Sequence, residues 1–396
     1  MHTEHLNRNK VRLISYLSFV LGFLDGFLIY ILSSYFSIVS GEQSVGVFYF
    51  IGYAVLLGVL FFLHPLIRKI GKARTLYLSL GLSILCCALL TRLPVSYVSA
   101  AILLVFIVAT NLTWVAQDIL LESFSKDQVS GRIRGLYLTI MSAGILGAPF
   151  LSTMTLARFD YSGVFFVLLV GYTVVFLVSL IGFRSDNAVP YRKPELFGAL
   201  KKMLREKNLF RIYHISLAME FFYAMMIVYT PLHLLSLGFS WKDIGIIFTF
   251  MLLPFVLLQY PLGILADKKL GEKELIIGSL AIVLVATATL PFLGGGILLP
   301  WIVFLFLTRV GIAGIEVLRD SYFYKQIDGD DMDIIAFFRT ARPVANILAA
   351  LIAVPLLLVL PFFAIFFIVA LMLFSALITS FFLRDTISEQ EILSKV

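Results

Sequence analysis

Two stretches of the chain, residues 110–131 and 308–329, share one pattern of acidic and aromatic residues. The first reads TNLTWVAQDILLESFSKDQVSG, and the second, 198 positions later, reads TRVGIAGIEVLRDSYFYKQIDG. Aligned without a gap, Asp118 and Glu122 fall on Glu316 and Asp320, and a serine and an aromatic residue follow each pair. Both stretches carry two acids at the same spacing, with aspartate and glutamate exchanged, which indicates an internal duplication. Such a duplication predicts a fold built from two similar halves.

The chain around these stretches is too apolar for a soluble protein. Its 396 residues are 60% hydrophobic and 14% charged, whereas soluble domains are about 45–50% apolar and about 25% charged. This composition excludes a soluble enzyme, a disordered protein and a disulfide scaffold. The two cysteines, Cys86 and Cys87, are adjacent in an apolar run, so we expect both to stay reduced.

Twelve apolar segments have the length of about 20 residues that a membrane-spanning helix needs. They predict an all-α integral membrane protein with helices near 12–39, 44–66, 74–92, 96–123, 133–157, 162–183, 209–236, 241–266, 273–293, 298–325, 333–360 and 361–383. We therefore predict an N-terminal six-helix bundle over 1–183, a cytoplasmic linker over 184–208 and a C-terminal six-helix bundle over 209–396. Parallel repeats of this kind are typical of transporters whose binding site lies between the halves.

The basic residues indicate how the chain crosses the membrane. With the N-terminus inside, the outer loops contain only Arg92, Arg158 and Lys242, and the positive charge collects on the inner side. We expect a multi-pass protein of the cell (plasma) inner membrane with both termini cytoplasmic. The net charge of +7 is then a topology signal, and we expect no nucleic-acid partner.

The linker predicts a short amphipathic helix that begins at Pro194. Its apolar face and its basic face are made by Leu196, Phe197, Leu200, Met203 and Leu204 and by Lys201, Lys202, Arg205 and Lys207. Such a helix is attracted to the anionic inner leaflet. A solvated connector without a lipid role is the alternative.

The loop after the eighth segment carries a recognisable motif. Residues 261–273 read PLGILADKKLGEK, in which Asp267 follows Gly263 by four positions and basic residues surround Gly271. This loop resembles the cytoplasmic signature of the major facilitator superfamily. The resemblance extends over the whole chain, in its twelve segments, two halves and long central connection. It implies two pseudo-symmetric bundles that expose a central cavity to each side of the membrane in turn.

The sequence also departs from the family pattern. In the first half, the matching loop has His64 and Arg68 where the family has glycine and aspartate, so we expect gating to depend more on the second copy. The stretch 144–149, GILGAP, is similar to part of a Gly/Pro motif of antiporters. The stretch 309–314, RVGIAG, is similar to a buried-arginine motif that the family usually carries in its fourth helix. Close packing at glycine explains both stretches equally well.

Three ionisable residues near the middle of predicted helices are candidates for proton coupling. Charge is costly inside a membrane, so Asp25, Glu220 and Arg309 are functional candidates. The family resemblance places their helices around the central cavity. Desolvation favours a neutral carboxyl group and a nearby cation favours a charged one, so access from alternate sides would change its proton affinity. A static ion pair that joins the halves is the alternative.

Two further groups of residues are candidates on the same helices and at their inner ends. Substrate-binding candidates are the polar and aromatic residues Tyr30, Asn111, Trp114, Tyr223, Tyr229 and Asn346. A cytoplasmic gate of acid–base pairs is predicted from Asp118, Glu122, Arg132, Arg134, Asp267, Glu316, Asp320, Arg339 and Arg342. Pairs that form and break supply the bistable contact that switching needs. Static anchoring of helix ends at the lipid headgroups is the alternative.

These observations predict a secondary active transporter that moves a small organic solute by proton-coupled alternating access, with antiport favoured. A lipid or lysolipid flippase of the same fold is an alternative, and a non-transporting membrane sensor or scaffold is an alternative of another class. No phosphate-binding loop, metal-ligand pattern or catalytic nucleophile motif occurs in the sequence. We therefore expect no enzyme activity, no cofactor and no metal. The expected partners are the substrate, protons and membrane lipids, and the expected state is a monomer.

Overall fold

The computed structural model describes residues 8–29, 31–40, 45–124, 130–183, 201, 203, 205–327 and 332–384, and the regular elements in these residues are all helical. The first half contains α1 (Arg8–Ile29), α2 (Leu32–Ser40), α3 (Val45–Ile70), α4 (Lys72–Leu90), α5 (Tyr97–Phe124), α6 (Ser130–Leu146) and α7 (Ala148–Gly182). The second half contains α9 (Lys207–Ser236), α10 (Trp241–Leu265), η3 (Ala266–Leu270), α11 (Lys273–Thr289), η4 (Leu290–Phe292), α12 (Leu298–Tyr324), α13 (Met332–Arg339), α14 (Ala341–Leu357) and α15 (Ala364–Phe381). The prediction of an all-helical protein is confirmed for this part of the chain.

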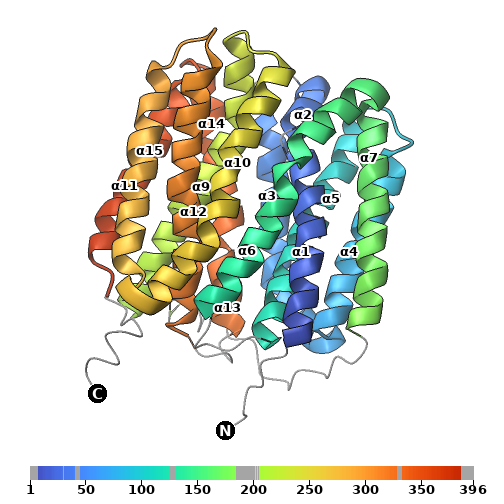
Figure 1. Cartoon of the computed structure of the whole chain (residues 1–396). Helices are drawn as coiled ribbons and strands as arrows, with labels where there is room; N and C mark the ends of the chain where they lie inside the picture. Colours follow the sequence, from blue (N-terminus) through green and yellow to red (C-terminus); the bar gives the residue numbers. More distant parts are fainter. Residues whose placement is uncertain are drawn as a thin grey trace, which may run out of the picture.

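Ten stretches of the described chain are long and apolar enough to cross a membrane. One of them, Gly135–Gly182, has 48 residues, more than twice the length of about 20 that one crossing requires. The backbone leaves the helical conformation inside it, at Asp160, with φ 57° and ψ −166°, and Figure 1 shows the chain turning back along α7. The apolar part of α3, Val45–Leu60, is shorter than the other stretches.

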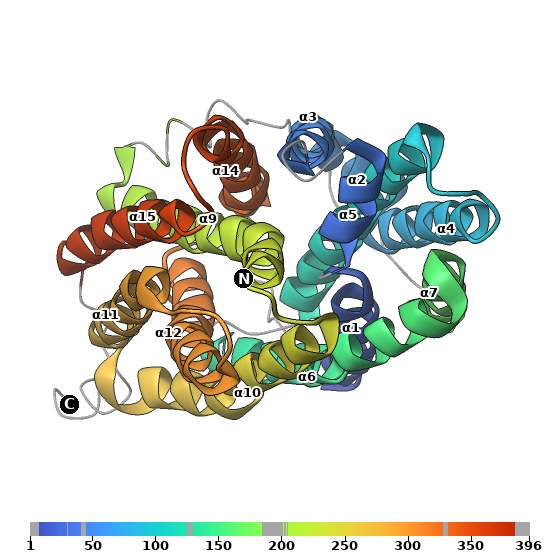
Figure 2. The same ribbon diagram turned by 90° about the horizontal axis from the view of Figure 1, so that it is seen from above.

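The helices lie side by side, and α1 begins at the same end of the molecule at which α15 ends, the lower end in Figure 1. The two halves meet along two seams. At one seam α6 packs against α10 and α12, and at the other α3 packs against α14, as the view from above shows (Figure 2). The amphipathic helix predicted for the linker falls mainly outside the described residues.

Glycines allow very close packing inside each half. A Cβ atom added at Gly144 of α6 would lie 2.0 Å from the carbonyl oxygen of Phe19 on α1, and one added at Gly22 would lie 2.3 Å from that of Met141. In the second half, a Cβ atom at Gly311 of α12 would lie 2.5 Å from the Ser279 carbonyl oxygen on α11. Small residues bring membrane helices together in this way. Close packing is therefore a sufficient physical reason for Gly144 and Gly311, one in each motif-like stretch.

Replacement of Gly144 with alanine is expected to destabilise the protein by about 1–3 kcal/mol, the usual cost of overpacking. The added methyl group would meet the backbone of α1, which cannot move without separating the two helices. Thermal unfolding of the purified protein in detergent measures this cost. Gly147→Ala is the matched control, because no atom lies within 4 Å of a Cβ at that position. Equal losses in the two variants would contradict the packing argument.

Candidate functional site

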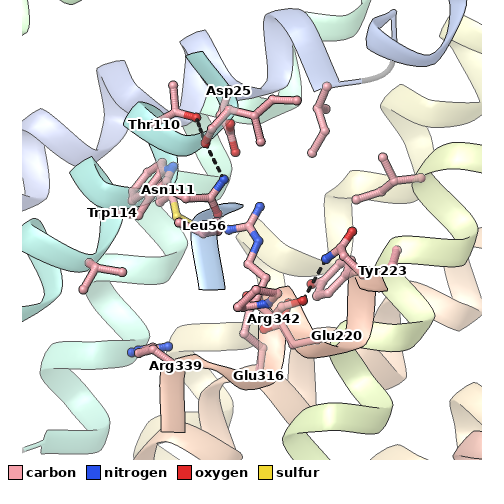
Figure 3. A pocket seen from close by; sticks show the side chains of 18 of the residues that line it. Asp25, Leu56, Thr110, Asn111, Trp114, Glu220, Tyr223, Glu316, Arg339 and Arg342 are labelled. Atoms are coloured by element: carbon pink, nitrogen blue, oxygen red, sulfur yellow. Dashed lines mark hydrogen bonds between the residues drawn. The ribbon is translucent and has the colours of Figure 1, made fainter. Parts of the chain in front are cut away.

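A cavity of about 280 Å³ lies between helices of the two halves. Residues from α1, α2, α3, α5, α6 and α7 line it on one side and residues from α9, α10, α12, α13 and α14 on the other. Its volume is close to the lower end of the range of about 300–1,000 Å³ usual for small-molecule pockets. Charged side chains project among aromatic and aliphatic ones (Figure 3).

Most of the residues singled out from the sequence lie at this cavity. Of the proton-coupling and substrate-binding candidates, those in its wall are Asp25, Asn111, Trp114, Glu220, Tyr223 and Asn346. Of the gate candidates, those in its wall are Asp118, Glu316, Asp320, Arg339 and Arg342. The structure thus brings together side chains that the sequence assigned to two separate places.

The remaining candidates lie elsewhere. Tyr229 is buried, and a Cβ atom at Gly46 of α3 would lie 2.8 Å from its hydroxyl oxygen. Tyr30 falls outside the described residues, and the side chains of Glu122, Arg132 and Arg134 are also outside the described part of the structure.

The placement of Arg309 in the cavity was wrong. This side chain is only 2% exposed and does not line the cavity. Its guanidinium carbon lies 5.0 Å from the ring centre of Phe222 and 5.6 Å from that of Tyr223. The cation therefore lies against aromatic rings of α9, an arrangement that attracts a buried positive charge.

Arg319 of α12 is the cation that pairs with Glu220. Its Nη1 lies 3.2 Å from Glu220 Oε1, and its Nη2 lies 2.9 Å from Asp320 Oδ1. Nη1 also donates a hydrogen bond of 2.9 Å to the hydroxyl group of Ser216. Sequence reasoning missed Arg319 because the equivalent position of the first half is Leu121. The available signal was an arginine directly beside a candidate acid in a membrane-spanning segment.

Arg339 joins the two halves. Its Nη2 lies 3.0 Å from Asp118 Oδ2 on α5 and 3.3 Å from Asp320 Oδ2 on α12. Asp118 belongs to the first half, whereas Arg339 and Asp320 belong to the second. The Asp118 and Arg339 side chains are 15% and 17% exposed. Both line the cavity, so the ion pair is partly accessible.

A chain of hydrogen bonds crosses the seam between α6 and α10. The Ser142 hydroxyl group donates a bond of 3.1 Å to Gln259 Oε1, and Gln259 Nε2 donates a bond of 2.7 Å to Glu316 Oε2. Gln259 is fully buried. It links a carboxylate of the cavity to the opposite half. Its role could not be predicted from the sequence, because glutamine carries no charge and does not stand out in a membrane-spanning segment.

Asp25 and Arg342 face the cavity without close ionic partners. Arg342 is hydrogen-bonded to Tyr53, and Figure 3 shows its side chain extending through the cavity toward the level of Asp25. Within the described part of the chain, no cation lies within 4.0 Å of the Asp25 carboxylate. Asp25 therefore presents to the cavity a carboxyl group that has no close cationic partner.

The signature loop forms a separate cluster at the lower end of the second half. Lys325, which follows α12, lies 3.0 Å from Asp267 and also pairs with Glu272. Ser321 donates a hydrogen bond of 2.8 Å to Glu272. Burial opposes the charge of Lys325, but the two carboxylates outweigh it and raise the pKa of Lys325 above its ordinary value. The cluster fixes η3 against the end of α12.

No group of three potential metal ligands occurs among the residues that the structure describes. A family model described as Major Facilitator Superfamily matches residues 108–318. The match begins within α5, ends within α12, and covers more than half of the chain. Comparison with curated proteins gives no match.

Proposed function

Because the chain belongs to the major facilitator superfamily, we propose that it is a secondary active transporter that carries a small organic solute by alternating access. The observation that carries this proposal is the cavity between the halves, with ionisable side chains from both. Five carboxylates and three arginines line it. Charge inside a membrane is costly, and such a concentration of it is typical of a substrate or ion pathway.

The proposed architecture has twelve membrane crossings in two six-helix bundles. It counts α1 with α2 as one crossing, α6 and α7 as two, and α13 with α14 as one, so that each half contains six. The bundles occupy 1–183 and 209–396, and the seams α6–α10 and α3–α14 are the surfaces along which they rock. The distribution of basic residues favours a cytoplasmic location for the lower end in Figure 1 and for both termini, in the inner membrane.

We further propose that protons are exchanged for the solute, and that Asp25 carries the proton. Glu220 is the weaker candidate, because Arg319 lies 3.2 Å from it and stabilises its charged form. Asp25 has no cation within that distance among the described residues and lines the cavity. A carboxyl group in this position can take a proton from either side as the cavity opens.

Proton flux in proteoliposomes tests this function. The purified protein is reconstituted with a pH-sensitive dye inside, and small organic cations, anions and neutral solutes are added outside in turn. At least one solute is expected to drive proton movement with the wild-type protein, and Asp25→Asn is expected to abolish it. Asp160→Asn is the matched control, because Asp160 is an exposed acid outside the cavity.

Three other outcomes would overturn parts of the proposal. Solute uptake by the wild-type protein without proton movement would exclude proton coupling. Movement of a fluorescent lysolipid between the leaflets, with no solute transport, would favour the flippase alternative. Transport of neither, by protein that is folded and correctly inserted, would favour a sensor or scaffold.

A further inference from the structure

We propose that the substrate is a monovalent organic cation with an aromatic or alkyl body, and that its positive charge binds beside Asp25. This inference rests on the proposed transport function and assigns its substrate class. It follows from the balance of charge in the cavity, from the partners of each charge, and from the aromatic side chains around Asp25.

The carboxyl groups that line the cavity outnumber its cations. Its carboxylates are Asp25, Asp118, Glu220, Glu316 and Asp320, and its cations are Arg319, Arg339 and Arg342. With all of them ionised, the cavity has an excess of two negative charges. A positive guest reduces this excess, whereas an anionic guest adds to it.

The ion pairs show where a cationic guest is needed. Arg319 pairs with Glu220 and Asp320, and Arg339 pairs with Asp118 and Asp320. Glu316 accepts a hydrogen bond from Gln259. Asp25 has no ion-pair partner within the described chain, so a bound organic cation can form an ion pair with its carboxylate.

Arg342 does not make this an anion site. It is bound to the hydroxyl group of Tyr53 and lies in the field of both Asp25 and Glu220. Its single positive charge is therefore shared between two carboxylates. A guest anion would compete with both of them for one arginine.

The side chains around Asp25 suit an organic cation. The cavity wall that contains Asp25 also contains Tyr53 of α3, Tyr172 of α7, and Asn111 and Trp114 of α5. The faces of tyrosine and tryptophan rings attract ammonium groups, and aromatic cages are the usual binding sites for quaternary ammonium ligands. A carboxylate next to such rings binds the charge and the apolar body of the cation together.

This arrangement also explains how the organic cation and a proton can be exchanged. The titratable and charged groups that face Asp25 are Tyr53 of α3, Tyr172 of α7 and Arg342 of α14. A proton and an organic cation neutralise the same carboxylate, so one leaves when the other binds. The cation and the proton then cross the membrane in opposite directions.

Equilibrium dialysis with radiolabelled benzyltrimethylammonium tests the inference, with phenylmethanesulfonate as a ligand of similar size and opposite charge. The wild-type protein in detergent is expected to bind the ammonium ion and not the sulfonate. Asp25→Asn is expected to weaken binding by about tenfold to a hundredfold, as typical for the loss of one charged contact. Trp114→Leu should weaken binding by about fivefold, whereas Trp114→Phe, which keeps a ring, should change it little.

The pH dependence of binding tests the inference on the wild-type protein, so that it does not depend on whether a variant folds. Binding of benzyltrimethylammonium is expected to weaken as the pH falls, because the proton competes for Asp25. Binding of the sulfonate instead of the ammonium ion, or ammonium binding that is insensitive to both pH and Asp25→Asn, would overturn the cation assignment. After such results, the proposed transport function would still hold if any solute drives proton flux in proteoliposomes. Ammonium binding without transport of any solute would overturn the transport function and leave the cation site in place.

Discussion

Arg319→Ala is expected to destabilise the protein by about 3–5 kcal/mol, the usual cost of removing one partner from a buried ion pair. The Arg319 side chain is 4% exposed and lies within 3.2 Å of both Glu220 and Asp320. Its removal takes one cation from Glu220 and one from Asp320. Thermal or chemical unfolding of the purified variant in detergent measures the loss, and transport should be lost with it.

The double variant Arg319→Ala with Glu220→Gln is the control for this prediction. It removes the cation together with one of the charges that the cation compensates, so part of the lost stability should return. The single variant Glu220→Gln completes the cycle and isolates the pairwise contribution, as is usual for residues in contact. If the double variant is destabilised by the full sum of the two single losses, the charge argument fails.

Sequence hydrophobicity predicted an all-helical protein, because the length and apolarity of a segment indicate which residues can enter the membrane. Asp25, Glu220 and Glu316 all proved to line one cavity. Periodicity did not predict which arginine accompanies them. Arg309 lies two turns before Glu316 on the same side of α12, but Phe222 and Tyr223 of α9 cover it. Helix–helix packing determines which neighbouring helix covers a given turn. The periodicity of a single helix does not predict that packing.

The internal repeat predicted the acidic residues correctly but did not predict the residues with which they pair. Asp118 and Glu316 are equivalent positions, and both line the cavity. Their partners differ, because Asp118 pairs with Arg339 and Glu316 accepts a bond from Gln259. Arg319 has leucine as its equivalent. Comparison of the two halves therefore finds what they share and misses groups that only one of them has.

The pair between Asp118 and Arg339 is expected to control the equilibrium between the two open states. Asp118→Asn removes a charged contact between the halves, worth about 1.5–3 kcal/mol for a hydrogen bond to a charged group. That corresponds to a shift of about tenfold to a hundredfold in the population that is open at the lower end. A cysteine at Leu60, which lines the cavity, reports the change in a background with Cys86→Ala and Cys87→Ala. Its labelling by a membrane-impermeant maleimide from that side should become faster.

The direction of this shift follows from the position of the pair. Asp118 lies on the last turns of α5 and Arg339 at the end of α13, so the contact holds the halves together near the lower end. We expect it to break when the cavity opens at that end. Arg339→Lys keeps the charge and should change the labelling rate much less than Asp118→Asn does. A lysine lacks the second nitrogen that lets one arginine bind several carboxylates, so a small effect is still expected. If Asp118→Asn leaves the labelling rate of Leu60→Cys unchanged from both sides, the pair only anchors two helix ends and does not act as a gate.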